Sequence, residues 1–174
     1  MHDTVQAWLR QLWHEHPALF HGTRVLECGS LIVNATASGF FADCEYTGLD
    51  ATPGPGVDVV SLVHEYQPEE PFDVALSTSM LEHDPHWRES VTHMADLLRP
   101  GGSLILTFPN PGWPEHELSC SPGESYYRNL EAGEVLALLD GRFDDVRAKR
   151  GDRRPETFVL ALGKREVLNA NLEY

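Results

Sequence analysis

VLECGS (Val25–Ser30) is an apolar, strand-like stretch that carries one acid and ends in a glycine turn. The stretch YTGLD follows it and ends at Asp50, roughly 20 residues beyond Gly29. A glycine at the end of a short strand lets backbone amides approach a ligand closely, and an acid that ends the next strand accepts hydrogen bonds from two ribose hydroxyls. This pattern is typical of the start of a nucleotide-binding βαβ unit, so it predicts a ligand that contains a ribose.

Seven apolar stretches are strand candidates, and helical patterns alternate with them along the chain. Several are too uniformly apolar to expose one face to water, which favours a parallel sheet covered by helices on both faces. We therefore expect an α/β fold. The seven stretches are TRVLEC (23–28), CEYTGLD (44–50), GVDVVS (56–61), FDVALST (72–78), GSLILTF (102–108), FDDVRAK (143–149) and ETFVLAL (156–162).

Apolar residues at helical spacing predict a helix at the start of the chain and another near its end. The first helix follows Asp3 and Thr4, either of which is a suitable cap. The other runs from about Glu131 to Leu139 and stops at Gly141. The apolar positions of the first helix are Val5, Trp8, Leu9 and Leu12.

The helix expected after the fourth strand has the clearest boundaries. Asp84 is its expected N-cap, and Pro85 fits its first turn. The segment Pro100-Gly101-Gly102 is expected to stop it and to turn the chain into the fifth strand. Its apolar stripe consists of Trp87, Val91, Met94 and Leu98.

Composition limits the classes of function. The chain of 174 residues is 41% hydrophobic, which suits one domain with a single core. Its 27 acidic and 13 basic residues give a formal net charge of -14, which repels nucleic acids and anionic membranes. Its three cysteines lack metal-ligand spacing, and no stretch approaches the roughly 20 apolar residues of a membrane span. We expect a cytoplasmic protein with reduced thiols and no nucleic-acid or membrane partner.

Two irregular segments follow strand ends. Thr52 to Gly56, with two prolines and two glycines, comes directly after Asp50. The segment Pro109 to Arg128 comes just past the fifth strand and is long for a loop in so small a domain. Ligands of open α/β sheets bind at the carboxyl ends of the strands, so both loops are expected to border one crevice.

The chain resembles the class I S-adenosylmethionine-dependent methyltransferases, in particular the small bacterial and phage members of the methyltransferase type 11 group. The resemblance covers about residues 23–163 and rests on VLECGS, YTGLD, FDVALSTSMLEHDPHW and LLRPGGSLILTFPNPG. It implies a Rossmann-like fold with a seven-stranded, mostly parallel sheet of order 3-2-1-4-5-7-6, whose last strand is antiparallel. It divides the chain into an N-terminal helix and linker (1–22), a methyltransferase-like domain (23–163) and a C-terminal tail (164–174).

The resemblance also implies contacts with S-adenosylmethionine as the cofactor. Glu27 and Gly29 would frame its methionine part, with Ser30 beside them. Asp50 would bind the ribose hydroxyls, and Ala51 would lie next to the adenine. Three residues at the end of the fourth strand would touch the methionine side: Ser77, Thr78 and Leu81.

The first and third loops depart from the family pattern. Family members usually carry two or three glycines in the first loop, whereas the residues here are Ser30, Leu31, Ile32 and Val33. Some small members have a comparable ExGS…VN loop, in which Asn34 would open the first helix and count among the cofactor-binding residues. After the third strand, Leu62 stands where an acid is expected, so adenine recognition would depend on backbone groups or on His64.

Several of these residues also have a structural interpretation. Asp50 would cap a turn ahead of Pro53, although its place at a strand end favours ribose binding. Glu27 lies in an apolar strand, where an unpaired charge is costly, so a ligand or a polar network is expected around it. The sequence EHDPH offers His83, Asp84 and His86 as metal ligands. Asp84 is better used as a helix cap, however, and no third, distant ligand is evident, so we expect no metal.

The acceptor side is marked by His83 and by residues of the long loop. His83 is the titratable side chain that the fourth-strand motif places near a methyl acceptor, where an imidazole can remove a proton; a histidine bonded to backbone at a helix start is the alternative. Two roles are open for Tyr126, Tyr127 and Arg128. They either close over the acceptor, with Arg128 binding a carboxylate or phosphate, or pack the loop onto the sheet.

The function expected from these features is methyl transfer from S-adenosylmethionine to a small molecule. The alternative is a methyltransferase-like domain without activity that binds a partner, which the glycine-poor first loop favours. A nicotinamide-dependent oxidoreductase needs a GxGxxG turn that the chain lacks. A homodimer is compatible with the acidic surface, although no segment marks an interface.

Overall fold

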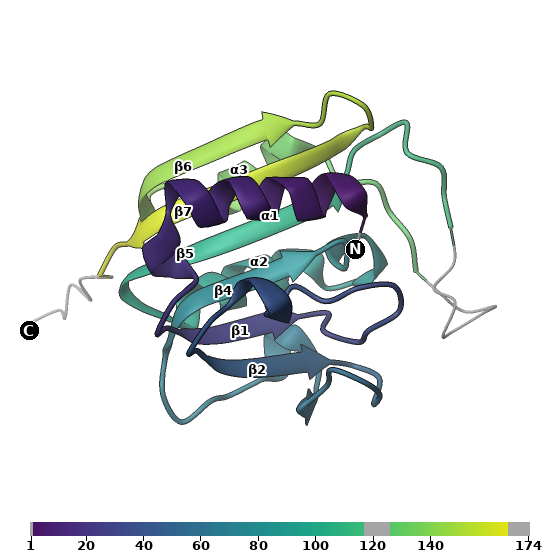
Figure 1. Cartoon of the computed structure of the whole chain (residues 1–174). Coiled ribbons are helices and arrows are strands. Elements are labelled where there is room, and N and C mark those ends of the chain that lie inside the picture. The colour runs from purple at the N-terminus through teal and green to yellow at the C-terminus, as the bar shows by residue number, and fades with distance from the viewer. Residues whose placement is uncertain (1, 117–125, 167–174) are drawn as a thin grey trace, which may run out of the picture.

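A seven-stranded sheet of order β3-β2-β1-β4-β5-β7-β6 forms the centre of the molecule (Figure 1). The computed structural model describes residues 2–116 and 126–166. Every strand pair is parallel except the two that involve β7, which confirms the expected strand order and the antiparallel last strand. The strands are β1 (Arg24–Cys28), β2 (Glu45–Asp50), β3 (Val59–Val60), β4 (Phe72–Thr78), β5 (Leu98–Pro109), β6 (Phe143–Arg150) and β7 (Glu156–Lys164).

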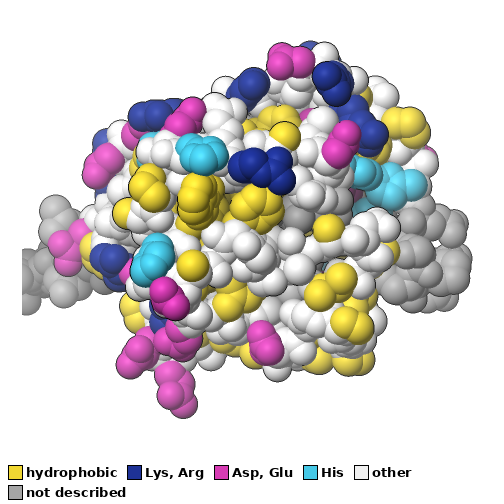
Figure 2. Space-filling view, viewed as in Figure 1, with side chains coloured by type: hydrophobic (Ala, Val, Ile, Leu, Met, Phe, Trp, Pro, Cys, Tyr) yellow, Lys and Arg dark blue, Asp and Glu magenta, His cyan; other side chains and the backbone are white. Residues whose placement is uncertain are grey.

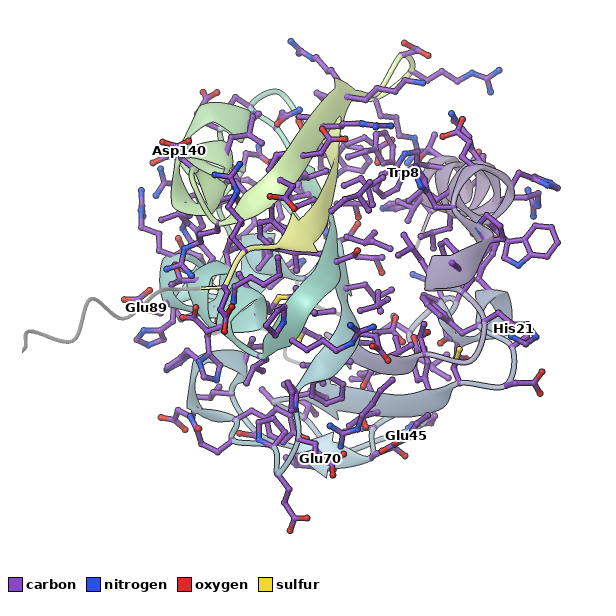
Figure 3. All side chains as sticks on the ribbon, turned by 90° about the vertical axis from the view of Figure 1, so that its left-hand side faces the viewer. Trp8, His21, Glu45, Glu70, Glu89 and Asp140 are labelled. Atoms are coloured by element: carbon purple, nitrogen blue, oxygen red, sulfur yellow. The ribbon has the colours of Figure 1, made fainter. Side chains whose placement is uncertain are left out.

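Helices cover both faces of the sheet, as its apolar strands require (Figures 1 and 3). Helix α1 (Asp3–Glu15) lies across one face and buries Val5, Leu9 and Leu12 against it. Helices α2 (Trp87–Asp96) and α3 (Ala132–Leu139) pack on the opposite face. In Figure 3, Trp8 and His21 therefore lie on one side of the sheet, whereas Glu89 and Asp140 lie on the other.

Four short 3-10 turns complete the described secondary structure. They are Pro17–Leu19, Ser38–Phe40, Val63–Glu65 and Leu81–His83. The last two directly follow β3 and β4, so they place polar residues beside the strand ends.

Two strands differ from the sequence prediction. The third is only two residues long, because Val59 and Val60 alone pair with β2. The fifth begins at Leu98 and runs through the Pro-Gly-Gly segment that was expected to precede it. Leu98 pairs with Phe72 of β4, and the register then shifts before Ser103 pairs with Val74. The irregularity accommodates the glycines within the strand.

The expectation that Asn34 opens a helix is wrong. Between β1 and β2 the described structure contains only the 3-10 turn Ser38–Phe40. The backbone amides of Leu31 and Ile32 are bonded to the loop after β2, through the Asp50 carboxylate at 3.2 Å and the Pro55 carbonyl at 2.9 Å. These bonds tie the residues just before Asn34 to the neighbouring strand end and loop.

The expected N-cap of the second helix is also displaced. Helix α2 begins at Trp87, and its N-cap residue is His86. Asp84 lies two residues earlier, where its carboxylate accepts hydrogen bonds from the His86 amide at 2.7 Å and from the Ser90 hydroxyl at 2.5 Å. Asp84 therefore still stabilises the start of the helix, although it does so from a turn that precedes it.

Charges of both signs are spread over the face that carries α1. In Figure 2, basic side chains lie mainly in the upper part of this face, and acidic ones gather at its lower left. No helix within residues 2–116 and 126–166 is long and apolar enough to cross a membrane.

Candidate active site

The carboxyl ends of the parallel strands meet at one edge of the sheet, where most of the expected cofactor residues lie. Cys28 at the end of β1 pairs with Leu49 of β2 on one side and with Ser77 of β4 on the other. The turn after Cys28, the acid Asp50 and the hydroxyl of Ser77 therefore belong to adjacent strands. The structure thus brings together residues that are separated by about 50 positions in the chain.

Asp50 ends β2 with its carboxylate turned toward the loop after β1. One oxygen, Oδ2, accepts the amide N–H of Leu31 at 3.2 Å, and Oδ1 accepts the amide of Thr52 at 2.9 Å. The side chain is half-buried, and each oxygen keeps a lone pair beyond these bonds. Asp50 therefore stabilises two loops and retains acceptors for two hydroxyl groups.

Gly29 forms a turn that only glycine fits. Its φ of +82° lies in the left-handed region, and a Cβ added there would lie 2.5 Å from the Cβ of Met80. The amides of Gly29 and Ser30 both donate to the Leu49 carbonyl, at 2.8 and 3.1 Å. These two amides are therefore engaged within the sheet, and Met80 occupies the space above the glycine.

The bulky residues of the first loop pack on glycines of the second loop. A Cβ on Gly54 would collide with Leu31, and one on Gly56 would lie 2.7 Å from Ile32. The family pattern places glycines in the first loop. In this chain the glycines lie in the second loop instead, where they leave room for the bulky side chains of the first. Val33 and Asn34 are exposed at the end of this loop.

Glu27 belongs to a buried polar network. Only 3% of its surface is exposed, and its carboxylate accepts the Tyr46 hydroxyl at 2.7 Å, the Thr36 hydroxyl at 3.4 Å and the Ala37 amide at 3.5 Å. Burial raises the pKa of Glu27, and the hydrogen bond from Tyr46 opposes this effect. Of the two expected surroundings, a ligand or a polar network, the structure shows the network.

Two buried hydroxyls beside the turn have no hydrogen-bond partner among the described residues. They are the Oγ atoms of Ser30 and Ser77, on residues that are 3% and 0% exposed. Thr78 and Leu81 are also buried at the end of β4. Because an unpaired buried hydroxyl is costly, these two atoms suggest polar groups that a bound ligand would supply.

The residues expected at the adenine are more dispersed. His64 lies in the turn after β3, where its ring stacks on that of His86 with 4.4 Å between centroids. Its Nδ1 is buried without a partner among the described residues. Ala51 and Leu62 are exposed, and the apolar side chain of Leu62 offers no acceptor for the adenine amino group.

His83 lies in an aromatic cluster with His116 and Tyr127. The ring centroids are 5.0 Å apart for His83 and His116, 5.3 Å for His83 and Tyr127, and 4.8 Å for His116 and Tyr127. Burial and the neighbouring His116 lower the pKa of His83 to about 4, so its imidazole is neutral at pH 7. Through these ring contacts, the turn after β4 lies against both described parts of the segment from Pro109 to Arg128.

Glu82 is a buried acid beside the candidate site that the sequence analysis did not single out. It is 1% exposed, and burial raises the pKa of its carboxyl to about 8. The sequence feature that could have identified Glu82 is an acid next to the apolar residue Leu81. An acid among apolar residues is also what drew attention to Glu27. Glu82 lies in a turn after the strand, where sequence alone does not predict burial.

The three residues of EHDPH that were considered as metal ligands do not form one group. The Asp84 carboxylate is bonded at the start of α2, and His86 stacks on His64. His83 instead lies with Glu82 and His116, and one ligand atom from each residue lies within 4.8 Å of the other two.

Arg128 is paired within the protein. Its guanidinium donates to both oxygens of the Glu134 carboxylate, at 2.9 and 3.0 Å, and lies over the Trp87 ring. The hydroxyl of Tyr127 donates to Asn129 at 2.8 Å, whereas Tyr126 is 37% exposed. Residues 117–125 of the expected lid lie outside the described residues. The described part of the loop favours packing for Arg128 and leaves Tyr126 accessible.

A cavity of about 450 Å³ opens next to this loop, on the side of α3. None of the expected cofactor residues lines it. We place the candidate site at the strand ends and not in this cavity, because the unpartnered hydroxyls of Ser30 and Ser77 lie there beside Asp50 and the glycine turn. The cavity is lined by Asn110, Pro111, Glu131, Ala132, Ala148, Lys149, Arg150 and Thr157.

Solved structures with the same fold include several methyltransferases. One is 1,6-didemethyltoxoflavin-N1-methyltransferase of Burkholderia thailandensis with bound S-adenosylhomocysteine, at 18% identity and a TM-score of 0.63, over 94% of this chain and 88% of that one. Another is N-methyltransferase NodS of Bradyrhizobium japonicum with S-adenosylhomocysteine. Its sequence identity is 16% and its TM-score 0.63, and the match covers 94% of this chain and 89% of that one. A third is magnesium protoporphyrin IX methyltransferase of Synechocystis with bound S-adenosylmethionine. Its sequence identity is 16% and its TM-score 0.59, and the match covers 94% of this chain and 77% of that one.

The family assignment comes from the sequence. The comparison with curated proteins found no match. A family model described as a methyltransferase domain matches residues 4–146, which include α1 and most of the sheet. The chain therefore belongs to the class I S-adenosylmethionine-dependent methyltransferase domain family.

Proposed function

We propose that this protein transfers a methyl group from S-adenosylmethionine to a small-molecule acceptor. The observation that carries the proposal is the position of Asp50, which ends β2 beside the glycine turn and keeps acceptors for two hydroxyls. Family membership supports the same reaction class. The strongly acidic composition argues against a nucleic-acid acceptor.

The residues at the strand ends fit the cofactor in their chemistry. Asp50 would hold the ribose hydroxyls, and the unpaired Oγ of Ser77 would gain a polar partner on the methionine side. Thr78 and Leu81 would bound that side, and His64 would meet the adenine. Glu27, already bonded to Tyr46, would contribute through an ordered network beneath the turn.

The protein's share in catalysis is alignment of the acceptor, exclusion of water and removal of a proton. When bound, the cofactor supplies a sulfonium methyl group that passes in line to a nucleophile. Removal of the acceptor's proton is assigned to His83 in the turn after β4, because its imidazole is neutral at pH 7 and can therefore accept a proton. Tyr126 is exposed beside it and would contact the acceptor.

A second function is favoured by a specific observation. Met80 packs on Gly29, and the amides of the turn are bonded to Leu49. A chain with this arrangement that binds no cofactor would be a methyltransferase-like binding domain without activity. The two functions differ in whether the protein binds S-adenosylmethionine.

Calorimetric titration of the purified chain with S-adenosylmethionine and S-adenosylhomocysteine tests the proposal, with NAD as the control ligand. Methyl transfer requires binding of the first two, with dissociation constants in the micromolar range, and no binding of NAD. Binding of none of the three would overturn the proposal and support the binding domain.

A further inference from the structure

The cluster formed by Glu82, His83 and His116 joins two segments that are far apart in the chain. Glu82 and His83 belong to the 3-10 turn after β4, whereas His116 belongs to the segment after β5. One ligand atom from each residue lies within 4.8 Å of the other two. This is the one group of its kind within the described parts of the chain.

Two atoms of this cluster are buried without a partner. The Oε2 atom of Glu82 and the Nδ1 atom of His83 accept no hydrogen bond from the described residues. Glu82 is 1% exposed, and no lysine or arginine in the described ranges forms an ion pair with it. A buried carboxylate in this state needs a cation or a proton.

The surrounding contacts hold the turn and the returning chain together. The Glu82 carbonyl accepts the Arg128 amide at 2.8 Å, and Tyr127 packs on both histidines. The Arg128 guanidinium points to Glu134, away from the Glu82 carboxylate. The backbone thus positions Glu82 beside the histidines, and its buried Oε2 atom is left without a partner among the described residues.

We propose that Glu82, His83 and His116 bind a divalent zinc-like cation. Two imidazole nitrogens and one carboxylate oxygen form a ligand set that suits Zn²⁺ and leaves a coordination position open. The unpartnered atoms favour the site as well, because a bound ion would displace the carboxyl proton of Glu82 and give its Oε2 atom the cation that the described residues do not supply. The ligand set differs from the EHDPH grouping of His83 with Asp84 and His86, which the sequence analysis considered and did not favour.

A cation at this position would also change the role of His83. His83 would act as a ligand, and an acceptor hydroxyl bound at the open position would have its pKa lowered by the metal. This consequence rests on the proposed function. The metal site itself does not, because none of the three ligands is among the expected cofactor residues.

The test is titration of the chain, free of a polyhistidine tag and stripped with a chelator, with Zn²⁺ by calorimetry and with Co²⁺ by visible absorption. The wild type is expected to bind one ion per chain. Glu82→Gln and His116→Ala should each weaken binding by more than about tenfold. His86→Ala is the matched control and should leave the affinity unchanged, because His86 lies outside the cluster.

Thermal unfolding of each variant shows whether the fold is kept. His116 is exposed, so its replacement spares the core even if Glu82→Gln does not fold. The proposal is overturned if the wild type binds neither ion, or if the His116 variant binds as tightly as the wild type. Cofactor titration of the metal-free chain is a separate measurement, so failure of the metal site is distinguishable from failure of the methyltransferase proposal.

Discussion

Met80 packs directly against Gly29, so that a Cβ on Gly29 would lie 2.5 Å from the Met80 Cβ. The contact joins the loop after β4 to the turn after β1, the two segments that would enclose the methionine part of a cofactor. It gives Gly29 a structural requirement independent of any ligand. The positive φ of Gly29 adds to this requirement.

The first prediction concerns Gly29→Ala. Left-handed strain and the clash with Met80 together should lower the free energy of unfolding by about 2–4 kcal/mol. Gly22→Ala is the matched control, because Gly22 also has a positive φ but has no atom within 4 Å of an added Cβ. Its cost should be only about 1 kcal/mol. Urea denaturation compares the two, and equal losses would show that the Met80 contact is unimportant.

The second prediction concerns Asp50→Asn. Loss of the carboxylate should weaken S-adenosylmethionine binding by about 1–3 kcal/mol, because bonds from the ribose hydroxyls would no longer be charge-assisted. Asp140→Asn serves as the control, since Asp140 is exposed at the end of α3 (Figure 3). Calorimetry gives both affinities. An unchanged affinity in the Asp50 variant would remove this residue from the cofactor site.

The third prediction distinguishes a buried hydroxyl that binds the cofactor, that of Ser77, from one that stabilises the fold, that of Ser90. Ser77→Ala removes a buried Oγ without a partner among the described residues, so stability should be unchanged or rise by up to about 1 kcal/mol. Cofactor affinity should nevertheless fall. Ser90→Ala is the control, because the buried Ser90 Oγ donates to Asp84 at 2.5 Å and its loss should cost about 1–3 kcal/mol of stability. A stability loss at Ser77 equal to that at Ser90 would contradict the assignment.

The fourth prediction is a pH dependence set by Glu27. Because burial raises the pKa of this carboxyl above its ordinary 4.5, the folded state holds the proton more tightly than the unfolded chain. Its contribution to stability is therefore greatest at or below pH 4.5 and decreases as the pH rises through the raised pKa. Tyr46 is the ionisable group bonded to it.

Glu27→Gln tests this dependence, since the amide oxygen still accepts the Tyr46 hydroxyl but does not ionise. The free energy of unfolding of the variant, relative to wild type, should rise between pH 4.5 and neutral pH. Tyr46→Phe should act in the opposite direction, because it removes a bond that favours the carboxylate. A difference between Glu27→Gln and wild type that stays constant with pH would show that Glu27 has no raised pKa.

Much of the fold was predictable because its signals are local. A run of apolar residues, as in FDVALST, indicates a buried strand. The spacing of Val5, Leu9 and Leu12 indicates the buried face of a helix. The strand order came from the resemblance. The absence of a helix at Asn34 was not predictable in this way, because the residues just before it, Leu31 and Ile32, are bonded to Asp50 at the end of β2 and to Pro55 in the loop after it.

The sequence by itself determined the order of strands along the chain, the acid that ends β2 and the glycine of the first turn, since each depends on a few adjacent residues. The tertiary structure alone decided that Leu31 and Ile32 pack on glycines of the next loop, and that Glu82 lies with His116. These contacts join segments that become neighbours only when the parallel strands align their carboxyl ends, and sheet register is a property of the assembled core.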